Sequence, residues 1–187
     1  RLVGSEMCIR DRNNFTSARS IEISENNYEE QLRSSIVKNI ELTNIGPSVM
    51  SGRVTDLEVN PNNPTEFYVA YASGGLWHTK NNGTTFSPIM DNSMTQNIGD
   101  FAIDWKSNSI YVGTGESNSS RSSYPGIGIL KSIDNGKSWK NIGLRDTHHI
   151  SRIIINPNDN QHVVVAAIGH LYSANTVSYT HLTLPTT

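Results

Sequence analysis

Residues 132–139, Ser-Ile-Asp-Asn-Gly-Lys-Ser-Trp, predict a tight turn between two β-strands. Asp and Asn side chains accept hydrogen bonds from the backbone N–H two residues further on, and Gly supplies the positive φ that a tight hairpin needs. Side chains of a strand alternate between its two faces, so Trp139 can reach a core while its neighbours face water. The segment therefore predicts a hairpin that is anchored by an aromatic side chain.

The same skeleton occurs earlier in the chain, at residues 79–86, with Asn81 for Asp134 and Phe86 for Trp139. β-rich segments surround both turns at the spacing of propeller repeats, roughly 40 to 50 residues. Long helical patterns between the strands are missing, which argues against a βαβ fold. The sequence predicts an all-β fold, a partial β-propeller of about three four-stranded blades.

Three blades do not close a ring, because propellers typically have roughly 4 to 8 of them. We therefore expect an open, truncated arc with exposed blade faces. Repeat units bury their apolar faces against their neighbours. The segment by itself is therefore expected to be unstable or prone to aggregation.

The two ends of the chain match one short DNA segment read in opposite orientations. Codons for residues 177–181, Val-Ser-Tyr-Thr-His, can be chosen so that their reverse complement encodes Met-Cys-Ile-Arg-Asp, which is residues 7–11. Residues 1–12 and 177–187 therefore resemble translated sequencing adapters and are left out of the fold prediction. Between them we expect a polar leader at 13–39, with a short helix around 27–37, and the propeller at 40–176.

Composition narrows the function classes. The chain has 187 residues, one cysteine and a formal net charge of -2. That charge offers no field to attract nucleic acid or an anionic membrane, and no apolar run is long enough for a transmembrane helix. Cys8 lies in the adapter-like end, so the propeller segment has no thiol nucleophile, disulfide or cysteine zinc site. No phosphate loop or dinucleotide fingerprint is present, and no cofactor is expected.

Residues 132–139 match the Asp-box pattern Ser/Thr-x-Asp-x-Gly-x-Ser/Thr-Trp/Phe at every position, and residues 79–86 are a degenerate copy. With the motifs at 44–47, 51–54, 72–77 and 113–116, the stretch 40–172 resembles bacterial proteins with BNR/Asp-box repeats. These are similar to the propellers of sortilin (VPS10) domains and of xyloglucanases. The resemblance implies an extracellular, periplasmic or cell-surface protein.

The resemblance also implies where the Asp-box lies. In those families it forms the hairpin between the third and fourth strands of a blade, at the periphery and away from the ligand mouth. Eight residues are therefore expected to be structural, namely Ser132, Asp134, Gly136, Trp139, Thr79, Asn81, Gly83 and Phe86.

An insertion at residues 116–126 is the main candidate for ligand binding. Loops on a rigid scaffold commonly carry function, and glycines at a strand end, here Gly113 and Gly115, let a ligand approach the backbone. The alternative is a flexible polar loop. A noncatalytic module that binds protein, peptide or glycan is expected to use five residues, namely Glu116, Asn118, Arg121, Tyr124 and Arg53.

A fragment of a glycoside hydrolase is the alternative function. Such enzymes use two carboxyl groups about 5 to 9.5 Å apart. In xyloglucanase-like propellers one of them precedes a Gly-Gly pair, where this chain has Ser73, and a hydroxyl cannot replace a carboxyl as acid or base near neutral pH. Asp56 and Asp104 remain, but the strand pattern favours structural or solvent-facing roles for both.

The sequence contains partial patterns for a sialidase site and for a metal site. A sialidase needs an arginine cluster and a tyrosine nucleophile. Arg53, Arg121 and Arg152 fall in successive units, but the Arg-Ile-Pro sequence that usually precedes sialidase Asp-boxes is missing. His148 and His149 would point to opposite faces of a strand, so no metal site is predicted there.

Overall fold

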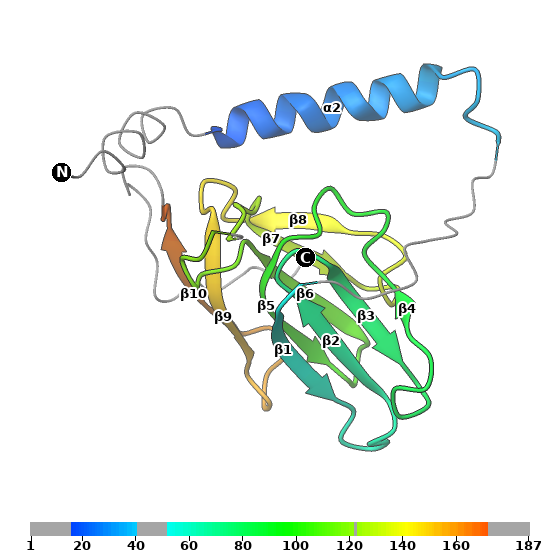
Figure 1. Ribbon diagram of the computed structural model, residues 1–187, viewed down its shortest axis with the longest axis vertical. Coiled ribbons are helices and arrows are strands. Elements are labelled where there is room, and N and C mark those ends of the chain that lie inside the picture. Colours follow the sequence, from blue (N-terminus) through cyan, green and yellow to red (C-terminus); the bar gives the residue numbers. More distant parts are fainter. Residues whose placement is uncertain (1–15, 41–51, 122, 172–187) are drawn as a thin grey trace.

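The computed structural model describes residues 16–40, 52–121 and 123–171 (Figure 1). The adapter-like ends and the motif at 44–47 lie outside these ranges. One helix, α2 (Ala18–Ser34), precedes a series of antiparallel strands.

Two four-stranded sheets and one strand pair follow each other along the chain, each in sequence order. The first sheet contains β1 (Val54–Val59), β2 (Phe67–Tyr71), β3 (Gly75–Thr79) and β4 (Ser87–Pro88). The second contains β5 (Ile98–Asp104), β6 (Ser109–Thr114), β7 (Ile129–Ser132) and β8 (Lys140–Gly143). The pair is β9 (His149–Ile155) with β10 (Val163–Gly169). The predicted all-β, partial β-propeller fold is confirmed: two complete blades and the first two strands of a third.

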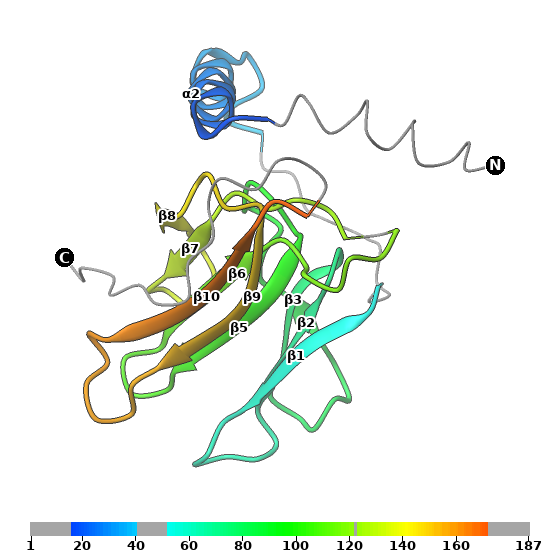
Figure 2. The ribbon, with the colours of Figure 1, turned by 90° about the vertical axis from the view of Figure 1, so that its left-hand side faces the viewer.

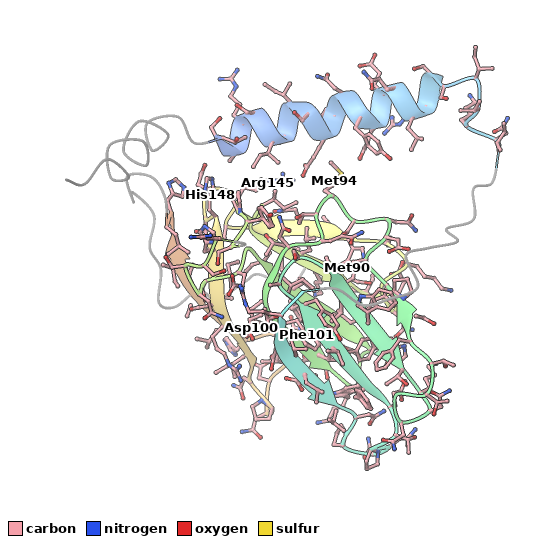
Figure 3. The ribbon with its side chains drawn as sticks, in the orientation of Figure 1. Met90, Met94, Asp100, Phe101, Arg145 and His148 are labelled. Atoms are coloured by element: carbon pink, nitrogen blue, oxygen red, sulfur yellow. The ribbon has the colours of Figure 1, made fainter. Side chains whose placement is uncertain are left out.

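The blades pack face to face through two apolar clusters. The cluster between the first and second blades contains Leu76, Met90 and Phe101, all almost fully buried (Figure 3). The cluster between the second and third blades contains Ile129 and Ile150. Strand β5, the first of its blade, lies between β1 and β9, the first strands of its neighbours (Figure 2). The inner strands of successive blades are therefore side by side.

The outer faces of the arc expose apolar side chains. Leu57 and Val59 on β1 are exposed, and so are Ile154 and Val164, which form a cross-strand pair on β9 and β10. In a complete ring these faces would pack against further blades. The open arc expected from the sequence is thus seen in the described residues.

Both predicted turns lie between the third and fourth strands of a blade and have the same hydrogen bonds. Asp134 Oδ1 accepts from the backbone N–H of Ser138 at 2.9 Å, and Ser132 Oγ accepts from the N–H of Gly136 at 2.8 Å. In the first copy, Asn81 Oδ1 accepts from the N–H of Thr85 at 2.9 Å. The N–H held by the Asp or Asn is thus four residues further on, not two as expected from an isolated turn.

The Asn-Gly pair of each turn has the positive φ angles of a type I′ turn. These are 57° and 80° at Asn82 and Gly83, and 59° and 84° at Asn135 and Gly136. The second turn also contacts the neighbouring blade, because Trp139 Nε1 donates to the carbonyl of Ile89 at 3.1 Å. A Cβ on Gly136 would lie 2.8 Å from Cβ of Ile89. This turn therefore helps to hold two blades together.

Replacing Asp134 with alanine is expected to lower stability without changing ligand binding. Hydrogen bonds from Ser138 and Ser132 lower the pKa of Asp134 to about 2 from its ordinary 3.8. This contribution is present above pH 3.8 and is lost as the pH falls through about 2. Thermal melts at pH 7 and pH 2 test it: Asp134→Ala should melt earlier than wild type at pH 7, and the gap should narrow at pH 2. An equal gap at both values would contradict this account.

Helix α2 begins and ends earlier than the range 27–37 expected from apolar spacing. Ser17 caps the helix by accepting from the N–H of Ser20 at 3.2 Å, and Arg33 pairs with Glu29 at 2.8 Å. None of its residues is fully buried. The apolar spacing that suggested the later range does not correspond to a buried face, because Tyr28 and Leu32 are exposed.

Candidate functional site

The insertion between β6 and β7 and the Asp-box turns lie at opposite ends of the blades. Strand β7 starts next to the insertion and ends at the turn that contains Asp134. The loop between β8 and β9 lies beside the insertion, since the N–H of Gly126 donates to the carbonyl of His148 at 2.7 Å. Helix α2 lies over this end (Figures 1 and 2), where Glu25 pairs with Arg145 at 2.8 Å. We call it the insertion end.

Glu116 is the anchor of the insertion. Its side chain is almost completely buried, and Arg53 Nη2 lies 2.6 Å from Oε2. Oε2 also accepts a short hydrogen bond from Ser123 Oγ, and Oε1 accepts from the backbone N–H of Asn118 at 3.1 Å. The carboxylate thus connects the start and the end of the insertion to the residue that precedes β1.

The charge of Glu116 is satisfied by these contacts. Burial raises the pKa of Glu116, but the hydrogen bonds from Ser123, Arg53 and Asn118 outweigh it and hold the pKa below its ordinary value. A buried carboxylate that is ionised and paired has no proton to donate and little freedom to move. Among the five predicted ligand-binding residues, the structure brings Glu116 and Arg53 together in an internal ion pair.

The other three predicted residues face solvent on the same loop. Asn118 and Arg121 are exposed, and 51% of Tyr124 is accessible. Arg53 also donates from Nη1 to Ser120 Oγ at 2.9 Å, which holds the loop at a second point. The loop therefore presents these three side chains from a backbone that is fixed at several positions.

The glycines near the insertion serve contact between blades, which differs from the expected approach of a ligand. A Cβ on Gly115 would lie 1.8 Å from the carbonyl oxygen of His148, and one on Gly113 would lie 2.4 Å from Cγ2 of Ile150. The N–H of Ile150 also donates to the carbonyl of Gly115 at 3.1 Å. The close neighbours that require these glycines are the backbone of His148 at Gly115 and the side chain of Ile150 at Gly113.

Three histidines at the insertion end have partners within the protein. His149 Nδ1 bonds with the carbonyl oxygen of Glu116 at 2.9 Å, and His170 Nε2 with that of Asp146 at 2.8 Å. The rings of His148 and His170 lie 4.0 Å apart. Burial is the main cause that lowers the pKa of His148 and His149. Within ranges 16–40, 52–121 and 123–171, no group of three or more His, Cys, Asp or Glu side chains could hold a metal ion.

A second cluster of charges lies on the inner strands of all three blades. Each of these strands has a register irregularity near its start, and the residue just after it is Asp56 in β1, Asp100 in β5 and Arg152 in β9. Bulges bend a strand and re-aim its side chains. Asp56 and Asp100 lie within hydrogen-bond reach of each other, and Arg152 Nη1 is 3.5 Å from Asp100 and 3.9 Å from Asp56. The repeat thus places three ionisable groups at equivalent positions.

Asp100 is the buried member of this cluster, with 2% of its surface accessible. Burial, together with the charge of Asp56, raises the pKa of Asp100 to about 7. The backbone N–H of Ile153, which donates to Oδ2 at 2.6 Å, acts in the opposite direction. Burial and Asp56 also raise the pKa of Glu58, while Arg152 lowers it. The carboxyl of Asp100 is therefore partly protonated near neutral pH, because burial and the neighbouring charge of Asp56 both disfavour its ionised form.

The other carboxylate and arginine positions from the sequence are explained by local contacts. Asp104, at the end of β5, accepts from Ser107 Oγ at 2.5 Å and Asn160 Nδ2 at 2.8 Å, and these contacts lower its pKa against the effect of burial. Arg53 and Arg152 both pair with acidic side chains of the protein, Glu116 and Asp100. Asp104 is thus a turn residue, as the strand pattern favoured.

Sequence reasoning missed Asp100, although a signal for it was present. Each of the three inner strands has a charged residue four positions before the polar residue that begins the following turn. The pairs are Asp56 with Asn60, Asp100 with Asp104, and Arg152 with Asn156. That comparison would have shown a charged residue at the same step of every inner strand.

Comparison with known proteins gives a fold but no family assignment. No protein-family model and no curated protein matches the chain. The described helix is not long and apolar enough to cross a membrane. Solved structures of GH74 enzymes are similar to the chain.

For three of these structures, the sequence identity, the share of each chain that is covered and the TM-score are as follows. A GH74 enzyme of Niastella koreensis is 24% identical over 59% of this chain and 16% of that chain, with a TM-score of 0.47. The GH74 xyloglucanase of Xanthomonas campestris is 16% identical over 59% and 18%, with a TM-score of 0.44. An ancestral GH74 enzyme is 22% identical over 65% and 14%, with a TM-score of 0.50. The chain thus spans less than a fifth of each structure, and the last of these similarities places it in the β-propeller fold.

Proposed function

We propose that the chain is part of a noncatalytic β-propeller module that binds a protein, peptide or glycan through its insertion end. The observation that supports this most is the fixed loop at residues 116–126. Its anchor, Glu116, is buried and paired with Arg53, while Asn118, Arg121 and Tyr124 face outward. A loop that is ordered before binding loses less entropy when the ligand arrives. An aromatic ring, an amide and a guanidinium then provide contact area, hydrogen bonds and charge.

The carboxylates of this segment support binding over hydrolysis. Asp56 and Asp100 lie within hydrogen-bond reach, whereas glycosidases hold their two carboxyl groups about 5 to 9.5 Å apart. Glu116 is neutralised by Arg53, and Ser73 stands where a related enzyme would have a carboxylate. The alternative, a fragment of a glycoside hydrolase, draws on the likeness to GH74 structures, which extends to the fold.

The proposal includes a location outside the bacterial cytoplasm, at the cell surface, in the periplasm or secreted. It draws on the resemblance of the Asp-box motifs. Fractionation of cells that produce the full-length protein, followed by immunoblotting, tests it; a purely cytoplasmic signal would count against it.

Replacing Tyr124 with alanine is expected to weaken binding at least about tenfold, because exposed aromatic residues dominate binding energies. Glycan and peptide arrays with the full-length protein identify the ligand class, and calorimetry with the best probe gives the affinity. Ile133→Ala is the control, since Ile133 is also exposed but lies in the Asp-box turn, at the opposite end of the blades. Equal affinities for Tyr124→Ala and wild type, or no bound probe on either array, would contradict the proposal.

A further inference from the structure

The loops between the first two strands of the three blades share one construction. Asn60, Asp104 and Asn156 each accept, through Oδ1, a hydrogen bond from the backbone N–H two residues further on. The three distances are 2.9, 3.1 and 3.0 Å. Because the same side-chain hydrogen bond closes each turn, the three loops can be aligned position by position from these turns alone. We call the end of the arc where these loops lie the turn end, because the Asp-box turns lie there too.

The second blade differs from its neighbours at the residue that follows Asn60, Asp104 and Asn156. The first and third blades have Pro61 and Pro157 there, and the second has Trp105. Proline satisfies the same turn in two blades out of three, and the shared hydrogen bond is present in all of them. The turn itself therefore does not require a tryptophan, and the large ring needs another explanation.

Trp105 lines a cavity of about 650 Å³ that lies between the three loops. Pro61 and Pro157 line it from the neighbouring blades, and Asn62, Asn158 and Asn160 add amide groups. Figure 2 shows the β1–β2 and β9–β10 loops at the end of the molecule opposite helix α2. Binding sites for small molecules commonly measure about 300 to 1,000 Å³ and combine apolar surface with a few polar groups. The size and the lining of this cavity fit that description.

The ring of Trp105 is supported on one side and has a free donor. It packs against Tyr68 at a centroid distance of 5.6 Å, and its residue is only partly buried. Trp77 and Trp139 donate their indole N–H groups to the carbonyls of Gly74 and Ile89. Among the described residues, the indole N–H of Trp105 donates no hydrogen bond. A ligand in the cavity can therefore use both the apolar ring and its donor.

Three charged residues line the cavity, namely Asp104, Asp159 and Lys106, and both carboxylates have partners within the protein. Asp104 is occupied by donors from Lys106, Ser107 and Asn160. Asp159 lies 2.7 Å from His162 Nδ1. The amide groups of the asparagines are neutral and offer both donors and acceptors. Sugars present alternating C–H faces and hydroxyl groups, which an aromatic ring and amides complement.

We propose that this cavity at the turn end is a binding site for a neutral saccharide, with Trp105 as the stacking platform. The site is separate from the insertion end and does not depend on the function proposed for it. Asn62 and Asn158, which line the same cavity from the neighbouring blades, donate to and accept from the sugar hydroxyls.

The test measures binding of cello-, xylo-, manno- and chitotetraose to the full-length protein by calorimetry and by tryptophan fluorescence. Trp105→Pro restores the residue of the neighbouring blades, and Trp105→Phe keeps an aromatic ring. At least one tetraose should bind wild type; Trp105→Pro should weaken it at least tenfold, and Trp105→Phe should weaken it less than Trp105→Pro does. Tyr124→Ala, at the insertion end, should leave this binding unchanged, so failure here is distinct from failure of the proposed function.

A second variant covers the case in which Trp105→Pro does not fold. The double variant Asn62→Ala/Asn158→Ala changes two exposed side chains at the cavity and should reduce the same affinity at least threefold while the melting temperature stays close to wild type. Binding of no tetraose, binding that survives Trp105→Pro in a folded protein, or binding that survives the double variant would each overturn the proposal.

Discussion

Asp100→Asn is expected to make the protein more stable near neutral pH and to flatten the dependence of its stability on pH. The asparagine has the shape of the protonated carboxyl. Its oxygen can accept from the N–H of Ile153, as Asp100 does at 2.6 Å, and its amide can donate to Asp56. The variant therefore keeps the contacts between the blades and removes the cost of ionising a buried group.

The sign follows from the direction of the shift. Burial, with the charge of Asp56, raises the pKa of Asp100 from 3.8 to about 7. Its stabilising contribution is therefore complete below pH 3.8 and is lost as the pH rises through about 7. Each tenfold change in proton affinity is worth about 1.4 kcal/mol, so the loss is at most about 4 kcal/mol. Arg152 attracts the ionised form and so reduces this loss. We therefore expect the free energy of unfolding of the variant at pH 8 to exceed that of wild type by about 2 kcal/mol.

Urea unfolding of the full-length protein at several values from pH 4 to pH 8 measures this effect. Asp104→Asn is the matched control, because Asp104 lies on the same strand but its pKa is lowered by its hydrogen-bond donors. That variant should lose stability at pH 8. If Asp100→Asn is less stable than wild type at pH 8, burial does not raise the pKa of Asp100 as described.

Gly99→Ala is expected to disrupt the contact between the second and third blades. A Cβ at this position would lie 1.9 Å from the carbonyl oxygen of Ile150 and 2.5 Å from that of Gly115. The Ile150 carbonyl belongs to β9, so it cannot move away without separating β5 from β9. We expect a cost of about 3 kcal/mol or more, at the upper end of what overpacking produces.

The control for Gly99→Ala is Thr55→Ala. Thr55 and Ser151 occupy the equivalent position in the neighbouring blades, so the bulge itself accepts a side chain. Thr55→Ala should cost less than about 1 kcal/mol, since its hydroxyl makes one long hydrogen bond, 3.4 Å, to the carbonyl of Ala70. Thermal denaturation of both variants compares them. Similar melting temperatures for Gly99→Ala and wild type would show that the blades can separate at this point without loss.

The architecture could be predicted from the sequence because its signals are local. The Asn-Gly pair and the flanking Asp134 specify a turn within eight residues, and the copy at Asn81 reveals the repeat. Contacts between blades are not local, so the sequence did not show that Gly115 faces the backbone of His148 or that Trp139 binds the carbonyl of Ile89.

The exposure of the insertion could be predicted in part, for the same reason. The composition of residues 116–126 pointed to a loop with exposed polar groups, and Asn118, Arg121 and Tyr124 are indeed exposed. Glu116 has a different environment, because Arg53, which is distant in sequence, approaches from before β1 and pairs with it. The partnership of Asp100 with Asp56 likewise depends on the packing of two inner strands.

The most direct test of the central claim, that this module binds but does not hydrolyse, is a polysaccharide-release assay on the full-length protein. Wild type, Asp100→Asn and Glu116→Gln are incubated with β-glucan, xyloglucan and xylan, and reducing ends are counted alongside binding. The account predicts that the protein binds its ligand and releases no reducing ends. Release by wild type that is abolished by Asp100→Asn or Glu116→Gln would contradict it and establish a glycoside hydrolase.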